Sequence, residues 1–242
     1  MNTFEESLAQ AAHLIVAADP LMLSIVGRSL AVSSLSCAIA CVLGIAVGAW
    51  LAVARFAGRE ALLTVLNTFL AIPSVVVGLA VYLLLTRNGP LGSLGWLFSF
   101  KAMVLAQALL VLPVATALTR QVVEDAERAN GEQLASLGAR GLLRSLLLAW
   151  DERFALLTVV LASFGRAISE VGAVMIVGGN IDGYTRVMTT AIALETEKGD
   201  LPLALALGFV LLSVVLVLNA AISIVSRWRG ARAEGLVLAG AT

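Results

Sequence analysis

Residues 30–54 read LAVSSLSCAIACVLGIAVGAWLAVA and contain no Asp, Glu, Lys or Arg. An α-helix needs about 20 consecutive apolar residues to cross the hydrocarbon core of a bilayer, which is roughly 30 Å thick. Backbone groups in lipid must form their hydrogen bonds within the membrane segment itself, and this run is too long for a barrel strand. The stretch therefore predicts a transmembrane helix.

Four further apolar runs follow the first one. They are residues 61–86, 102–118, 154–177 and 203–225. Hydrophobic residues make up 60% of the 242-residue chain and charged residues only 13%, which is about half the charged fraction of a soluble domain. We therefore expect an all-α membrane protein with five transmembrane helices in a domain that covers residues 28–226.

The positions of the basic residues predict the orientation of the chain, because cytoplasmic loops carry an excess of Lys and Arg. With the N-terminus outside, the cytoplasmic side receives Arg55, Arg59, Arg120, Arg128, Arg140, Arg144, Arg153, Arg227, Arg229 and Arg232. The outer side then receives Arg28, Arg87, Lys101, Arg186 and Lys198. This asymmetry favours an outer N-terminus and a cytoplasmic C-terminal tail, residues 227–242.

Residues 1–27 precede the predicted membrane domain, and the first twenty of them lack the basic start and the cleavage site of a signal peptide. Apolar side chains recur there at helical spacing, at Phe4, Leu8, Ala12 and Ile15. We expect a helix that lies on the outer membrane surface and ends at Asp19-Pro20. A frayed polar terminus is the alternative.

Residues 119–153 form the longest segment outside the predicted spans and mix charge with leucine. Residues 132–138 predict a short helix that Gly138 ends, because glycine readily adopts positive φ. Leucines 142, 143, 146 and 147 predict a second amphipathic turn that is too short to span a membrane. Two short helices at an angle could fit the groove of a soluble partner, and a linker helix on the lipid headgroups is the alternative.

Arg166 and Glu170 are the only charged residues inside any predicted span. Their i,i+4 spacing puts them on one helix face, where they can pair. Charges at this depth must face the bundle or a wet cavity. The pair predicts either an internal ion pair or a charged lining of a translocation path.

Glycine and proline residues interrupt two of the predicted spans. The fourth span has four glycines in or beside it, namely Gly165, Gly172, Gly178 and Gly179. They predict close helix packing, and a break in the helix is the alternative. Pro73 removes one backbone hydrogen bond from the second span and predicts a kink.

Several classes of function are disfavoured by composition. Sixteen basic against sixteen acidic residues argue against a nucleic-acid partner. The single His13 and the two cysteines, Cys37 and Cys41, argue against a metal centre, and the cysteines are expected to pack as small apolar residues. Neither Lys101 nor Lys198 follows a glycine, so the chain lacks a phosphate-binding P-loop and any ATP must be bound by another polypeptide.

The spacing of Glu132, Ala135 and Gly138 resembles the cytoplasmic loop by which permease subunits of bacterial ABC importers seat into their ATPase subunits. Five other segments resemble the permeases for molybdate, tungstate and sulfate. They are AIPSVVVG (71–78), RNGPLG (87–92), FGRAISEVGA (164–173), VGGNI (177–181) and TRVMTTAIALET (185–196). The last segment is most similar to the tungstate branch.

This resemblance implies a type I ABC importer fold of the molybdate/methionine permease kind, a homodimer in a bacterial cytoplasmic (inner) membrane. It implies an ATPase subunit dimer that carries the ATP and Mg, an outer tungstate-binding protein that docks on residues 180–200, and no cofactor on this chain. The implied ATPase-coupling residues are Glu132, Gln133, Leu134, Ala135, Leu137, Gly138 and Ala139. The implied pathway residues are Arg166, Ser169, Glu170, Gly172 and Asn180.

Alternatives remain at two levels. Molybdate or sulfate could replace tungstate as the substrate, because these tetrahedral dianions differ little. An ion-coupled carrier or a channel is the alternative from another class, although the five unequal runs show no paired repeat. An enzyme is the least favoured class, since no segment assembles a nucleophile with a base.

Overall fold

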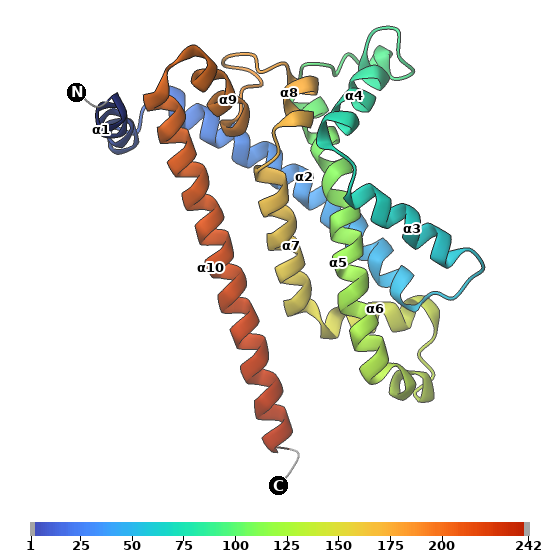
Figure 1. The fold of residues 1–242 in the computed structure, drawn as a ribbon. Coiled ribbons are helices and arrows are strands. Elements are labelled where there is room, and N and C mark those ends of the chain that lie inside the picture. Colours follow the sequence, from blue (N-terminus) through green and yellow to red (C-terminus); the bar gives the residue numbers. More distant parts are fainter. Residues whose placement is uncertain (1–2, 240–242) are drawn as a thin grey trace. The chain divides into compact units, whose positions relative to one another are not determined.

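The computed structural model describes residues 3–239, and the side chains of residues 5–226 within them. This part of the chain is all-α and contains no β-strand (Figure 1). The helices are α1 (Thr3–Val16), α2 (Pro20–Val53), α3 (Arg59–Leu70), α4 (Ser74–Leu85), the 3₁₀ helix η1 (Gly92–Leu94), α5 (Phe100–Ser136), α6 (Gly141–Asp151), α7 (Arg153–Ile168), α8 (Gly172–Gly178), α9 (Met188–Lys198) and α10 (Leu201–Ala239). The all-α prediction is confirmed.

Three single helices are long and apolar enough to cross a membrane, namely α2, α5 and α10. The pairs α3 with α4 and α7 with α8 each qualify as one span when they are taken together. By length and composition, the described residues therefore provide three to five candidate spans, and the predicted five are reached if each bent pair is one span. The tail predicted at 227–242 continues α10 as far as Ala239, and residues 240–242 lie outside the described residues.

The N-terminal segment forms the predicted helix rather than a frayed terminus. Helix α1 ends at Val16, and Ala18 turns the chain with φ of 50°. Asp19 accepts a hydrogen bond from the backbone N–H of Met22 at 2.9 Å and so caps α2. Helix α2 begins at Pro20, so the predicted boundary after residue 27 falls inside it.

The chain divides into two compact units. One contains the chain up to Ser36, Ile72–Leu110 and Arg166–Leu216. The other contains Cys37–Ala71, Val111–Gly165 and the chain from Val217 onward.

The core of the first unit forms where α4 packs on α8 and on the start of α5 (Figure 1). Val81 and Leu85 of α4 meet Val174 and Val177 of α8, and Met103 of α5 is fully buried against them. The contact is close because Gly78 has no side chain: a Cβ there would lie 2.7 Å from Cα of Ala173. Two short half-helices thus share one apolar surface.

Helices α4 and α8 begin next to Pro73 and at Gly172, two residues that the sequence analysis singled out. Pro73 precedes α4 with φ of −59° and ψ of 133°, so the second span breaks there instead of only kinking. Gly172 opens α8, and a Cβ on it would lie 2.8 Å from Cγ2 of Val75 and 2.9 Å from Oγ of Ser74. Glycine in the fourth span therefore serves both the close packing that we predicted and the helix break that was the alternative.

The second unit is held by small residues on α2 and α5. A Cβ on Gly44 would lie 2.7 Å from Cβ of Ala115, which shows how closely the two backbones approach. Cys37 and Cys41 are buried beside Ala115 with their sulfurs 3.6 Å apart. The prediction that these cysteines pack as apolar residues is confirmed.

Candidate functional site

The segment predicted to contact a partner is an elbow, which we define as residues 132–151. Residues 132–136 are not a separate short helix, as we predicted, but the last turn of the 37-residue helix α5. Gly138 has φ of 86°, its N–H donates to Ala135 O at 3.0 Å, and the N–H of Ala139 donates to Leu134 O at 2.9 Å. This is a Schellman ending, and it confirms that Gly138 stops the helix.

The predicted coupling residues lie together at this ending. Glu132, Gln133, Ala135, Leu137 and Gly138 are exposed. Leu134 packs partly against the core of the second unit, and Ala139 is buried. The first group can meet a partner, whereas the last two hold the elbow on its own unit.

Helix α6 presents two different faces. Ser145 and Leu148 are buried, and Leu148 joins Val123 and Ala126 of α5 in an apolar cluster. The opposite face leaves large apolar side chains exposed, namely Leu142 (62%), Leu143 (57%), Leu146 (57%) and Trp150 (70%). A run of uncovered apolar residues on a charged segment is typical of a contact surface for another protein.

Five charged side chains in or beside the elbow were not predicted as site residues. Glu124 of α5 pairs with Arg59 at 2.5 Å and with Arg120 at 2.8 Å, and Glu127 pairs with Arg144 of α6 at 2.5 Å. All five side chains are 17–21% exposed. The sequence signals only the i,i+4 pair of Arg120 with Glu124, because the other pairs join distant positions.

Arg166 and Glu170 form the predicted ion pair in the first unit, with 2.7 Å between Nη1 and Oε2. Glu170 lies in the break after α7, not within a continuous helix. Its side chain is 4% exposed, whereas that of Arg166 is 42% exposed. The carboxylate is therefore an internal group and the guanidinium reaches the surface of the chain.

Glu170 also holds the two helix breaks together. Its carboxylate accepts hydrogen bonds from the backbone N–H of Ala173 at 3.3 Å and from the Ser74 hydroxyl. Its backbone carbonyl accepts from Oγ1 of Thr189 at 2.7 Å. Ser74 starts α4 and Ala173 lies in the first turn of α8, so one acidic side chain links the starts of both half-helices.

We expect Glu170→Leu to destabilise the protein by about 2–3 kcal/mol, because it removes an acceptor that serves three donors and leaves Arg166 without its partner. The expected loss is below that of a fully buried pair, since Arg166 is partly exposed. Thermal unfolding of the purified protein in detergent measures it. Glu197→Leu, at an exposed position of α9, is the control, and equal unfolding temperatures for both variants would contradict the role of Glu170.

The other predicted pathway residues lie near this break or at the far end of α8. Ser169 is an exposed residue of the turn itself, and Gly172 opens α8. Asn180 follows α8 with φ of 49°, and its Nδ2 donates to Thr190 O at 3.2 Å. Four of the five predicted pathway residues thus lie at or beside the break between α7 and α8, namely Arg166, Ser169, Glu170 and Gly172. They are also close in sequence, whereas Asn180 lies at the other end of α8.

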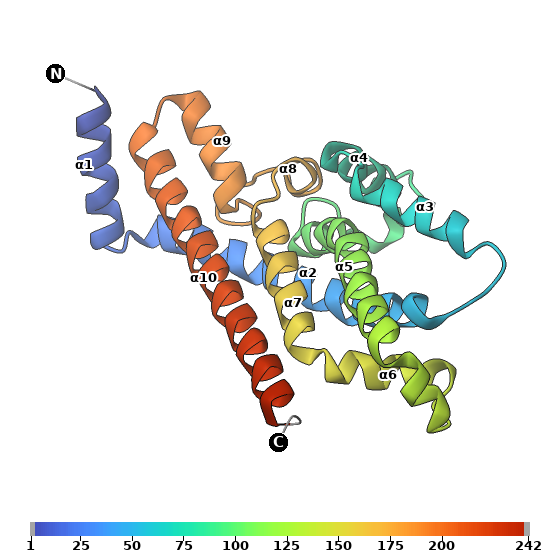
Figure 2. The same ribbon diagram turned by 60° about the horizontal axis from the view of Figure 1, so that its bottom comes forward.

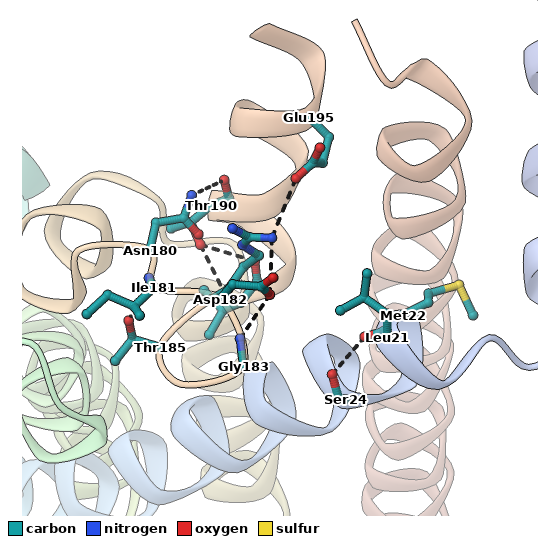
Figure 3. Close-up of polar contacts among 12 residues, drawn as sticks. Leu21, Met22, Ser24, Asn180, Ile181, Asp182, Gly183, Thr185, Thr190 and Glu195 are labelled. Carbon is teal, nitrogen blue, oxygen red and sulfur yellow. Dashed lines mark hydrogen bonds and ion pairs between the residues drawn. The ribbon is translucent and has the colours of Figure 1, made fainter. Parts of the chain in front are cut away.

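The loop after α8 and helix α9 are held by a charge cluster (Figure 3). Arg186 lies 3.2 Å from Asp182 and 3.6 Å from Glu195, and Lys198 lies 3.0 Å from Glu195. Arg28 of α2 donates to the backbone carbonyls of Gly183 and Arg186 at 2.8 and 2.9 Å. These charges fix the loop on its own unit, and Glu197 and Asp200 remain exposed for other contacts.

In the described part of the chain, no three or more His, Cys, Asp or Glu side chains gather in a way that could hold a metal ion.

Comparison with known proteins gives relatives that match nearly the whole chain. The tungstate uptake system permease protein TupB of Peptoclostridium acidaminophilum is 40% identical over 222 residues, which are 92% of this chain and 97% of that protein. The probable anion ABC transporter permease protein of Haloferax volcanii is 39% identical over 82% of this chain and 88% of its own length. TupB of Campylobacter jejuni is 37% identical over 88% of this chain and 90% of its own length. No protein-family model matches the chain.

Proposed function

Because this chain belongs to the ABC transporter permeases, which are translocation subunits and not enzymes, we propose that it is the membrane subunit of an ATP-driven tungstate importer. The observation that carries the proposal is its match to 97% of a permease named for tungstate uptake. That match covers 222 residues, 92% of this chain, so it is not confined to one shared motif.

We propose that the elbow seats in an ATPase subunit. The exposed leucines and Trp150 of α6 supply the apolar contact area, and the exposed end of α5 at Glu132 and Gln133 supplies the polar rim. ATP and Mg belong to that partner, since this chain has no P-loop sequence.

The protein would act as a homodimer. Five spans are few to enclose an ion path with two alternating gates, and a two-fold dimer supplies ten spans and two elbows for a pair of ATPase subunits. Closure of the ATPase pair on ATP would then move both elbows and switch access to the path from one side of the membrane to the other.

Arg166 is our candidate for a transient contact with the anion. Its side chain is 42% exposed although it lies in a span. Glu170 would fix its position, and Ser169, Gly172 and Asn180 would lie along the same path. The membrane potential opposes the entry of a dianion: at 100 mV, inside negative, the entry costs about 5 kcal/mol. Import therefore needs an energy source.

We propose that the chain lies in a bacterial cytoplasmic membrane with its N-terminus outside, because ten of its basic residues then lie inside against five outside. Residues 180–200 would face outward, where the exposed Glu197 and Asp200 are available to a tungstate-binding protein.

Uptake into proteoliposomes that contain the permease, its ATPase and its binding protein tests the substrate. We expect uptake of tungstate at nanomolar concentration to persist in about 100-fold excess of molybdate or sulfate, because a relative that matches over nearly its full length is named for tungstate. Competition by molybdate at equal concentration would favour the molybdate alternative. Uptake of sulfate in place of tungstate would favour the sulfate alternative.

A further inference from the structure

Two acidic residues near the C-terminal end of α5 each hold a different helix of the second unit. Glu124 binds Arg59, the first residue of α3, and Glu127 binds Arg144 of α6, each at 2.5 Å. Residues three apart lie on one helix face. The same stretch of α5 therefore contacts both the elbow and the start of the broken second span.

Helix α6 crosses the C-terminal part of α5 (Figure 2). Their contact has two parts that lie one helical turn apart along each helix. Leu148 of α6 and Val123 of α5 are both fully buried in one apolar cluster. Arg144 and Glu127 stand one turn away from them on the same faces and are 18% exposed. Apolar contact is not directional and allows helices to slide, whereas separation of a mostly buried ion pair leaves charges without partners. The ion pair therefore fixes the register.

Glu124 gives the start of α3 a similar fixed contact. Its Oε1 binds Arg59 and its Oε2 binds Arg120 of α5 itself, so both carboxylate oxygens are used. Arg59 Nε also donates to the carbonyl of Leu51 at the end of α2, at 3.2 Å. The N-terminus of α3 is thus held mainly by charge, and Leu63, one turn after Arg59, is the only buried residue of α3 among those described.

An open groove of about 610 Å³ lies beside these pairs and is bordered by Arg59, Arg120, Glu124 and Glu127. Room of this size lets the junction shift without collision with a packed core. On the helix itself, Gly131 leaves space for Glu127, since a Cβ on that glycine would lie 2.8 Å from the carboxyl carbon.

We propose that Glu127–Arg144 and Glu124–Arg59 form a mechanical junction that passes a displacement of α6 through α5 to α3. This inference rests on the proposed function, in which an ATPase displaces the elbow. Arg144, Glu127, Glu124 and Arg59 are positioning residues: they contact neither ATP nor the anion, and they set how completely hydrolysis is converted into transport.

The test is the number of ATP molecules hydrolysed per tungstate imported, measured in proteoliposomes with the ATPase and the binding protein. Glu127→Arg and Arg144→Glu are each expected to lower import about tenfold while ATP hydrolysis changes about twofold or less, and the double swap E127R/R144E should restore the ratio. Glu124→Gln removes the ion pair with Arg59 of α3 without reversing a charge. It should also raise the number of ATP molecules hydrolysed per tungstate imported. Asp125→Arg breaks the exposed pair with Arg128 on the same helix, and it should leave the ratio unchanged.

Failure of the double swap to restore the ratio, or a normal ratio in the single variants or in Glu124→Gln, would overturn the junction. A parallel loss of hydrolysis and import would also overturn it, because that result indicates a damaged docking surface. If the wild-type complex shows no ATP-driven uptake, the proposed function fails and the junction fails with it. That result is distinct from an active wild type with unaffected variants.

Discussion

Replacing Gly78 with leucine is expected to separate α4 from α8 and to abolish import. A Cβ at this position would lie 2.7 Å from Cα of Ala173 and 3.2 Å from its carbonyl oxygen. Both are backbone atoms and cannot rotate away, so the half-helices must move apart. Overpacking of this kind costs about 1–3 kcal/mol or more, which is a large share of a typical stability of about 5–15 kcal/mol.

Thermal unfolding in detergent and tungstate uptake together measure this effect. Gly27→Leu on α2 is the matched control, because nothing lies within 4 Å of a Cβ at that helical glycine. We expect the control to unfold at or slightly above the wild-type temperature, since leucine is the better helix former by roughly 0.5–1 kcal/mol. Equal losses in both variants would contradict the close contact of α4 with α8.

The double substitution Leu143→Asp and Leu146→Asp is expected to abolish capture of the ATPase without a change in folding. Both side chains are 57% exposed, so the permease loses little of its own packing. A partner that covers them would lose apolar contact and would have to bury two carboxylates. Loss of a central interface residue costs about 2–4 kcal/mol, so each substitution alone should lower the affinity about 30-fold or more, and the pair should lower it further.

Affinity capture of the ATPase by the tagged permease in mild detergent measures this loss, and an unchanged unfolding temperature shows that the variant is folded. Arg128→Asp is the control, because it adds negative charge at a side chain that is 75% exposed but removes no apolar surface. Retention of the ATPase by the leucine variant at the wild-type level would exclude α6 as the docking helix.

The spans could be predicted from the sequence because each is long and nearly free of charge. The breaks could be predicted only in part. Pro73 signals a lost hydrogen bond, but a kinked helix and two separate half-helices have the same local sequence. The structure distinguishes them through a distant partner, since α4 packs on α8 where Gly78 meets Ala173.

The elbow shows a different limit. Gly138 could be identified as a helix end because few other residues adopt positive φ. The continuous helix from Phe100 to Ser136 was missed, because a hydropathy pattern ends where charge begins, at Arg120, although the helix continues. The partner of Arg144 could not be predicted either, because several acidic residues of α5 are plausible from the sequence, namely Glu124, Asp125, Glu127 and Glu132. Only the packing of α6 on α5 selects Glu127.

Accumulation of tungstate inside sealed proteoliposomes that contain the purified complex, with ATP and Mg supplied to the ATPase side, tests the central claim most directly. We expect the internal concentration to rise above the external one only with ATP, and to be insensitive to a protonophore or a sodium ionophore. Accumulation by the permease alone, without ATP and driven by an ion gradient, would contradict an ATP-driven permease.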